Sequence, residues 1–133
     1  MSTFRALASV GVLIAAGLGV AAPAHADGAS DRSGIQRIYV NGRLVATGSF
    51  NSRGEIFRAS DNRRDGRSAI VYYSVRGGPI RACINSRGAG TTRTCNKSFR
   101  EGSRVLWRTC AIDRETGNGY CAPWVSDRAR TNG

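Results

Sequence analysis

The sequence predicts an all-β protein: a small antiparallel, immunoglobulin-like β-sandwich of seven to eight strands, tied by two disulfides and preceded by an N-terminal signal peptide. Three observations predict this class. Helical periodicity is nearly absent after residue 34, short runs rich in β-branched and aromatic residues recur at intervals of about ten residues, and Gly, Asn, Asp and Ser separate these runs. A small Greek-key barrel is the alternative architecture.

The first 26 residues have the pattern of a secretory signal peptide. Arg5 precedes an apolar stretch over residues 6–22, and Ala24-His25-Ala26 forms a small-x-small cleavage site. The only histidine of the chain lies in this site, so the 107-residue mature chain is expected to contain none. The sequence thus divides into signal peptide, flexible leader, β-sandwich domain and polar tail, over residues 1–26, 27–34, 35–127 and 128–133.

Turn residues delimit the expected strands in order. Asn41-Gly42 is a strong hairpin signal because both residues tolerate positive φ, and the charged segment 61–67 separates the third strand from the fourth. The fourth strand contains Ala69–Tyr73 without a polar break, which is typical of a central strand covered on both faces. The eight expected strands are Ile35–Val40, Arg43–Phe50, Glu55–Ser60, Ser68–Val75, Pro79–Asn85, Thr91–Phe99, Arg104–Asp113 and Gly119–Ser126.

Alternation of apolar and polar residues does not assign a core face in the first hairpin. A two-residue turn would place Val40 opposite Arg43 and Tyr39 opposite Leu44. Each face would then mix apolar side chains with arginine. The sequence alone therefore does not show which face of this hairpin lies in the core.

The four cysteines predict two disulfides in an exported domain, with three possible connectivities. Cys83 shares a strand face with Arg81 and Asn85, and Cys95 shares one with Arg93 and Lys97, while Ile80, Ala82 and Ile84 form the opposite, apolar face. We therefore expect Cys83–Cys95 as a cross-strand bond near the solvent side. Cys110–Cys121 is expected as the second bond across the next loop. Crossed pairing, Cys83–Cys121 with Cys95–Cys110, remains the main alternative.

The charge of the chain favours anionic partners. The formal net charge is +11, nineteen of the twenty basic residues are arginine, and loss of the signal peptide leaves about +10. Expected partners are an anionic cell-wall polymer, a nucleic acid or an acidic protein, held by salt-sensitive attraction. The other interpretation is that the arginines form solvated strand exteriors. The candidate anion-binding residues form a loop and a strand face: Arg63, Arg64 and Arg67, and Arg81, Arg93 and Lys97.

The mature sequence lacks the residues needed for several common catalytic and metal-binding sites. Without histidine in the mature chain, Ser-His-Asp and Cys-His sites are excluded, and the widely spaced cysteines do not form a zinc pattern. No cofactor or metal is expected. Carboxylates such as Glu55 and Glu101 lie at predicted turns or strand ends, which is typical of turn formation and solubility. The aromatic residues Tyr72, Tyr73, Trp107 and Trp124 lie inside apolar runs and are expected in the core.

Three segments together resemble a family. Tyr39-Val40-Asn41-Gly42, Thr94-Cys95-Asn96 and Tyr120-Cys121-Ala122-Pro123-Trp124-Val125 resemble uncharacterised small secreted actinobacterial β-sandwich proteins with an N-terminal signal peptide. The resemblance implies extracellular release and a β-sandwich. It implies no activity and no site residues.

The expected function is that of a secreted, monomeric, non-catalytic interaction module with a basic surface and no membrane span in the mature chain. Two alternatives remain. The loop between Cys83 and Cys95, with Arg87 and Arg93, could act as the stapled loop of a secreted protease inhibitor. A carboxylate-dependent hydrolase using Glu55 and Glu101 is the other.

Overall fold

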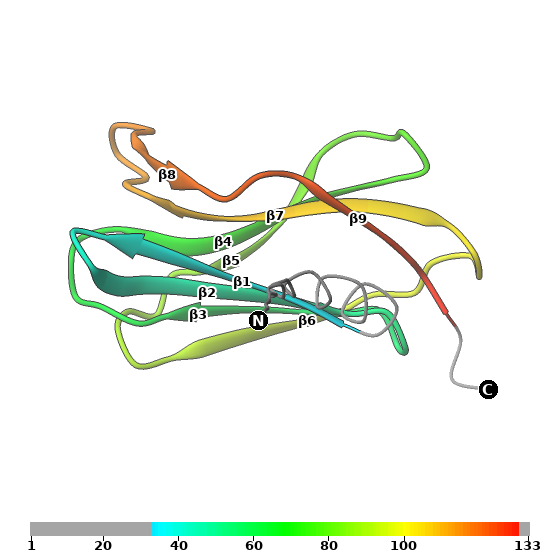
Figure 1. Cartoon of the computed structure of the whole chain (residues 1–133), viewed down its shortest axis with the longest axis horizontal. Helices are drawn as coiled ribbons and strands as arrows, with labels where there is room; N and C mark the ends of the chain where they lie inside the picture. Colours follow the sequence, from blue (N-terminus) through cyan, green and yellow to red (C-terminus); the bar gives the residue numbers. More distant parts are fainter. Residues whose placement is uncertain (1–32, 131–133) are drawn as a thin grey trace, which may run out of the picture.

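A computed structural model describes residues 33–130 (Figure 1). The predicted signal peptide, the leader up to residue 32 and residues 131–133 of the tail lie outside the described residues. The described part of the chain contains nine strands: β1 (Ser33–Val40), β2 (Arg43–Asn51), β3 (Ile56–Asp61), β4 (Ser68–Val75), β5 (Arg81–Asn85), β6 (Thr92–Asn96), β7 (Arg104–Ile112), β8 (Gly119–Cys121) and β9 (Val125–Arg128).

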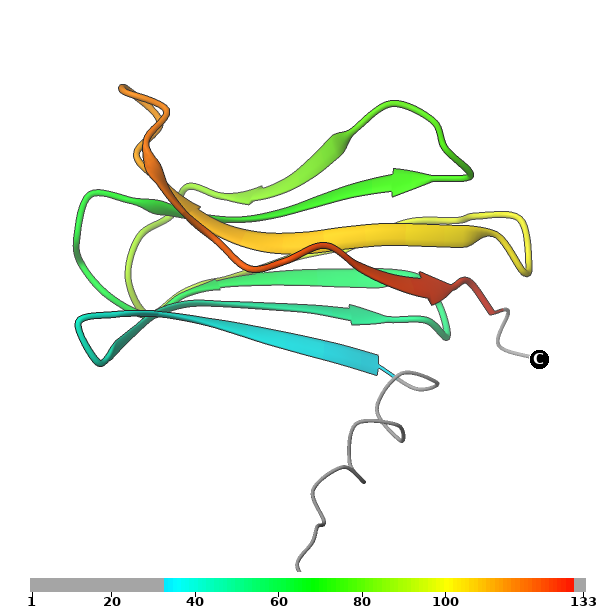
Figure 2. The same cartoon turned by 45° about the horizontal axis from the view of Figure 1, so that its top comes forward.

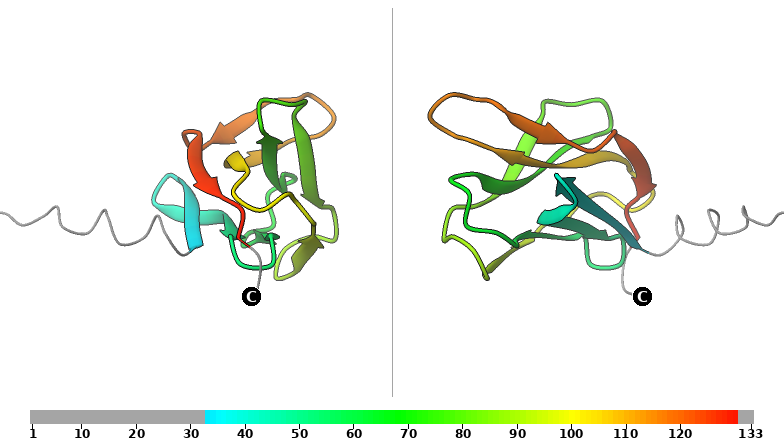
Figure 3. Two further views of the ribbon diagram at one scale, coloured as in Figure 1. Left: turned by 90° about the vertical axis from the view of Figure 1, so that its right-hand side faces the viewer. Right: turned by 60° about the vertical axis from the view of Figure 1, so that its left-hand side comes forward.

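Two antiparallel sheets pack face to face, which confirms the predicted all-β sandwich with two disulfides (Figures 2 and 3). The first sheet has the order β1-β2-β3-β6. The second has the order β5-β4-β7-β8, and β9 pairs with the other half of the same edge of β7. The chain passes between the sheets after β3, β5 and β6, so strands distant in sequence become neighbours.

The core lies between the two sheets and is rich in aromatic rings. Phe57 stacks on Phe50 at 4.6 Å and on Tyr73 at 4.4 Å between ring centroids, and all three are buried. Tyr73 belongs to β4, which pairs with β5 on one side and β7 on the other. The predicted central position of this strand is therefore confirmed. Ile70 of β4 is buried on the face opposite Tyr73, so this strand is covered on both faces there.

Two glycines let the first sheet approach β7 closely. A Cβ on Gly34 would lie 2.5 Å from Trp107, and a Cβ on Gly48 would lie 2.7 Å from Cγ2 of Thr109. The side chain of Gln36 joins the sheets at the same place. It accepts a hydrogen bond from the backbone N–H of Thr109 (2.6 Å) and donates one to the carbonyl of Pro123 (2.8 Å). These contacts fix the separation of the sheets beside the gap between β8 and β9.

The first hairpin contains a β-bulge, which explains why alternation assigned no core face. Ile38 pairs with Ala46 and Tyr39 pairs with Leu44, so Val45 is the extra residue on β2. Val45 and Ala46 are consecutive and both buried. A bulge moves the following residues to the opposite face, so a regular two-residue period cannot describe this strand.

Both disulfides join the expected partners, but the expected position of the first is wrong. Cys83 in β5 and Cys95 in β6 belong to different sheets, so their bond ties the two layers together instead of crossing a hairpin. Cys83 is buried in the core, whereas Ile80 is 64% exposed. The face of β5 expected to be apolar thus points outward. Cys110–Cys121 links directly paired residues of β7 and β8.

The last expected strand is interrupted. The backbone between Cys121 and Val125 contains Pro123, which has no N–H for a ladder bond, and β8 and β9 lie on either side of it. Trp124 lies in this break and is 37% exposed, and Tyr72 is only half-buried, so neither is in the core, whereas Tyr73 and Trp107 are. Packing continues beyond β9, since Ala129 is buried.

Candidate functional site

One end of the sandwich carries two neighbouring pockets. The β1–β2 turn, the β3–β4 loop, the β5–β6 loop and the β7–β8 loop all lie at this end, on the left of Figure 1. The β3–β4 loop (residues 62–67), here named the basic loop, contains Arg63, Arg64 and Arg67. These are three of the predicted anion-binding residues, and the structure brings them together with other arginines from the neighbouring segments.

Two aspartates shape the basic loop. Asp61 accepts a hydrogen bond from the backbone N–H of Arg63 (3.1 Å), and Asp65 accepts one from that of Arg67 (3.0 Å). The other oxygen of Asp65 lies 3.4 Å from the guanidinium of Arg67. Each aspartate therefore closes a local turn of the Asx type, which favours this loop conformation. The backbone N–H of Asn62 adds a bond to the carbonyl of Val45 (3.0 Å).

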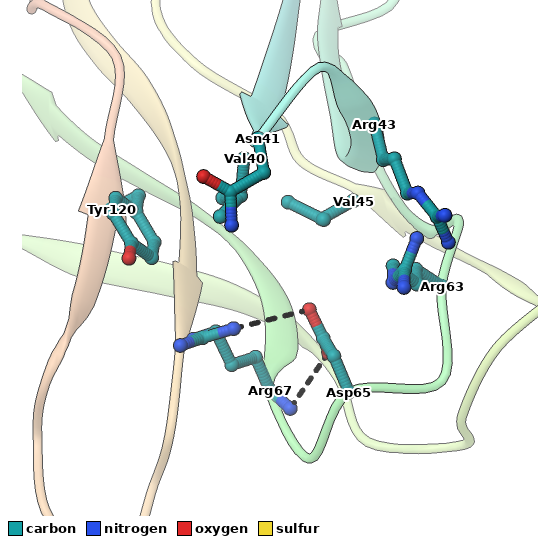
Figure 4. A pocket seen from close by; sticks show the side chains of 8 residues that line it. All are labelled: Val40, Asn41, Arg43, Val45, Arg63, Asp65, Arg67 and Tyr120. Atoms are coloured by element: carbon teal, nitrogen blue, oxygen red, sulfur yellow. Dashed lines mark hydrogen bonds and ion pairs between the residues drawn. The ribbon is translucent and has the colours of Figure 1, made fainter.

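The first pocket has a volume of about 570 Å³ and lies between the basic loop, the β1–β2 turn and β8 (Figure 4). Tyr120 and Arg67 line one side of it, with the Arg67 guanidinium 5.1 Å from the centre of the Tyr120 ring. Arg43 and Arg63 lie on the opposite side. Three arginines against one aspartate give the lining a net charge of +2. The lining residues are Val40, Asn41, Arg43, Val45, Arg63, Asp65, Arg67 and Tyr120.

The second pocket, of about 590 Å³, lies between the basic loop and the β5–β6 loop. Arg63, Arg64, Arg67 and Arg87 line it together with Asp61 and Asp65, so its lining also carries a net charge of +2. The two pockets share Arg63, Asp65 and Arg67. The basic loop is therefore a common wall between them.

Asn85, at the end of β5, holds the far wall of the second pocket. Its buried amide donates hydrogen bonds to the carbonyls of Ala59 (3.0 Å) and Thr91 (2.8 Å). Its oxygen accepts one from the backbone N–H of Arg87 (2.9 Å). Thr91 in turn donates from its hydroxyl to the carbonyl of Gly88 (2.6 Å). The β5–β6 loop is thus a compact turn held by its own hydrogen bonds.

Four arginines carry the charge that these pockets offer to a ligand. Within residues 33–130, the side chains of Arg43, Arg63, Arg64 and Arg87 make no hydrogen bond or ion pair. Arg67 differs, because Asp65 and Tyr120 already contact its guanidinium. An unpaired guanidinium presents up to five N–H donors in a planar fork, which suits phosphate, sulfate and carboxylate groups.

Asp61 adds a dependence on pH to the second pocket. Burial raises the pKa of its carboxyl above the ordinary value of 3.8, the hydrogen bond from Arg63 opposes the rise, and the negative charge of Asp65 adds to it. Protonation of Asp61 removes a negative charge from the pocket lining. The pocket therefore becomes more positive at the acidic end of this titration.

The second predicted group of basic residues does not join this site. Arg81 begins β5 and Lys97 follows β6, both toward the other end of the sandwich, whereas Arg93 lies near the start of β6. Arg93 and Lys97 are four positions apart, or about 13 Å along an extended chain. All three are exposed, and none lines either pocket.

Sequence reasoning missed Arg43 and Tyr120 as site residues. Arg43 directly follows the Asn41-Gly42 turn, and Tyr120 directly precedes a disulfide cysteine. The available signal was their place beside turns, since loops at one end of a sandwich converge in space. The sequence alone does not show which turns share an end.

The carboxylates considered for hydrolysis serve the turns at the other end. Glu55 is buried with φ of 50°, and its carboxylate accepts a hydrogen bond from the backbone N–H of Phe99 (3.1 Å). Glu101 is exposed in the turn before β7. Neither residue lines the two basic pockets.

The described residues also bear on metal binding and on membrane spanning. No group of three or more His, Cys, Asp or Glu side chains within residues 33–130 is arranged to hold a metal ion. In the same part of the chain, no helix has the length and apolar character needed to cross a membrane.

Comparison with known proteins returns no relative. A scan against models of protein families matches none of them, and searches of curated proteins and of solved structures find no similar protein.

Proposed function

We propose that the mature chain is a secreted, non-catalytic interaction module that binds an anionic ligand at the two basic pockets. One observation carries the proposal. Four arginines from three separate segments, Arg43 in β2, Arg63 and Arg64 in the basic loop and Arg87 in the β5–β6 loop, line adjacent pockets without partners in the described part of the chain. Keeping like charges close together opposes folding, so their convergence favours a role in binding.

The proposed location outside the cell has separate support. The N-terminal 26 residues have the pattern of a signal peptide, and both disulfides are of a kind that persists in oxidising compartments. The non-catalytic role is favoured because the two aspartates that line the pockets hold backbone N–H groups of the basic loop. These hydrogen bonds explain why aspartate is present at both positions, so no catalytic role is needed to explain them.

Neither alternative function has a specific observation in its favour. The β5–β6 loop is a compact turn with positive φ at Gly88 and Gly90, whereas a segment that occupies a protease cleft is extended. Glu55 is a buried turn residue. The basic pockets are therefore the better-supported site.

A charge-matched pair of variants tests the proposal. Arg63→Gln and Arg81→Gln remove the same charge from exposed or half-exposed side chains, but only Arg63 lines the pockets. On a heparin column eluted with a salt gradient, we expect Arg63→Gln to elute at clearly lower salt than wild type and Arg81→Gln to shift little. Equal shifts in the eluting salt concentration would mean that binding to heparin depends only on net charge, and the proposed site would be rejected.

A further inference from the structure

The two basic pockets are joined by a common wall, which suggests that they act together. Arg63 and Arg67 line both pockets, while Arg43 lines only the first and Arg64 and Arg87 line only the second. A ligand with one anionic group can occupy one pocket at a time. A ligand that carries anionic groups in series can occupy both by passing over the basic loop.

The wall between the pockets is held in place from both sides. Asn62 donates its backbone N–H to Val45, at the floor of the first pocket, and Gly90 donates to the carbonyl of Asp61 (2.8 Å), beside the second. The turns closed by Asp61 and Asp65 add to this. Because these bonds fix the loop from within the fold, little further ordering of the loop is needed when a ligand binds.

The residues that line the pockets favour some kinds of polyanion over others. Duplex DNA has a persistence length of about 150 base pairs, so it does not bend around a loop of this size at low cost. Single-stranded nucleic acids gain affinity by stacking bases on aromatic rings. Tyr120 is the one aromatic residue lining the two pockets, and Arg67 already lies against it.

We propose that the two pockets are consecutive subsites for one flexible, linear polyanion whose anionic groups repeat along a backbone without stacked bases. This inference rests on the proposed function, because it assumes that the pockets bind anions. It adds that binding is bivalent. Engagement of the second pocket then occurs within the complex, at a high effective concentration, and raises affinity without any new contact.

Two linear phosphates of different length test the inference. Tripolyphosphate can fill one pocket, whereas a chain of about 15 phosphates can reach both. By isothermal titration calorimetry at fixed ionic strength, we expect the long chain to bind wild type about 100-fold more tightly than tripolyphosphate. Arg43→Gln and Arg87→Gln should each abolish that advantage, because each removes an arginine that lines only one of the two pockets and leaves the other pocket intact. Arg81→Gln is the charge-matched control and should keep the full advantage.

The possible failures are distinguishable. If tripolyphosphate binds wild type but chain length adds nothing, or if the advantage survives in both single variants, the bivalent site is wrong and the proposed function stands. If wild type binds neither phosphate more tightly than the Arg43→Gln/Arg87→Gln double variant does, the proposed function fails as well. If single-stranded DNA of matched charge binds more tightly than the long phosphate, the ligand is a nucleic acid and the inferred ligand class is wrong.

Discussion

The closest approach of the two sheets gives a prediction that tests the packing directly. In Gly48→Ala, the new Cβ would lie 2.7 Å from Cγ2 and 2.8 Å from Cβ of Thr109, and closer still to its Oγ1. Neither side can move freely. Gly48 pairs with Gln36 and Ala59 on the two flanking strands, and Thr109 is held through its backbone N–H by Gln36.

The expected cost follows from this confinement. Adding a methylene to a well-packed core costs about 1–3 kcal/mol, and a clash between two hydrogen-bonded sheets should lie at the upper end. We therefore expect Gly48→Ala to lower the free energy of unfolding by about 3 kcal/mol. Gly78→Ala is a suitable control. Its Cβ would lie 3.1 Å from the carbonyl of Val75 in an exposed turn that can adjust, so we expect a loss below about 1 kcal/mol.

Thr109→Ala should relieve part of the clash, because it removes Oγ1 and Cγ2 and leaves only the Cβ, 2.8 Å from the new methyl carbon. The Thr109 hydroxyl is buried and finds no hydrogen-bond partner within residues 33–130. Removing the hydroxyl removes an unpaired polar group whose burial costs about 1–3 kcal/mol, and the lost methyl group contributes about 1 kcal/mol to stability. The single variant Thr109→Ala should therefore have nearly the same free energy of unfolding as wild type. The double variant Gly48→Ala/Thr109→Ala should then recover about 2 kcal/mol relative to the sum of the single variants.

Urea unfolding followed by tryptophan fluorescence measures all four proteins of this cycle, since Trp107 lies in the core. The reasoning is refuted if Gly48→Ala unfolds within about 0.5 kcal/mol of wild type, or if the double variant is no more stable than additivity requires. The m-value should be the same in all four proteins, because the surface area exposed on unfolding should not change.

Three further predictions concern the disulfides, the second pocket and pH. Replacing Cys110 and Cys121 together with alanine should lower the free energy of unfolding by about 3 kcal/mol, from the loop closed at a sequence separation of 11; a loss below about 1 kcal/mol in urea unfolding would contradict this. Asn85→Ala should lower the free energy of unfolding by about 2–4 kcal/mol, because the carbonyls of Ala59 and Thr91 lose their donor. It should also speed hydrogen exchange of the backbone amides in the β5–β6 loop, and unchanged exchange there would count against the anchoring role of Asn85. The pKa of Asp61 in the folded protein lies above 3.8, so the stability that its protonated carboxyl contributes is complete below pH 3.8 and is lost as the pH rises through the folded pKa. Asp61→Asn does not titrate and should therefore gain stability relative to wild type between pH 3 and pH 7. A stability difference that does not depend on pH would oppose this.

The sequence predicted the fold class and the disulfide partners, but it misplaced one of the bonds. The sequence predicts the Cys83–Cys95 pair as a hairpin contact, because the two runs are adjacent in sequence and each cysteine alternates with polar residues. In the structure the chain changes sheets between β5 and β6. Adjacent strands in different sheets bring inward faces together, so the same two residues meet in the core. Local alternation does not reveal which connection crosses the sandwich.

Register and the site depend on tertiary features that have no local signature. The bulge at Val45 reverses the faces of the first hairpin, and nothing in the run Arg43–Phe50 marks it. The basic loop could be recognised from its own arginines. Arg43 and Arg87 join it only because the sheet order places three loops at one end. A site assembled from separate segments requires the topology first.

The arginines of the pocket end differ from the backbone of the opposite end in how much they contribute to packing. At the end opposite the pockets, the segment after β9 closes the structure: Gly102 donates to the carbonyl of Ala129 (2.8 Å), Ala129 donates to that of Ser103 (2.9 Å), and Arg130 donates to that of Ser52 (2.9 Å). Ala129 and Ser52 are buried there. The unpaired arginines of the pocket end support no such backbone contacts through their side chains. Substitutions at Arg43 should therefore change ligand affinity with little change in unfolding free energy, whereas substitutions at Ala129 should do the reverse.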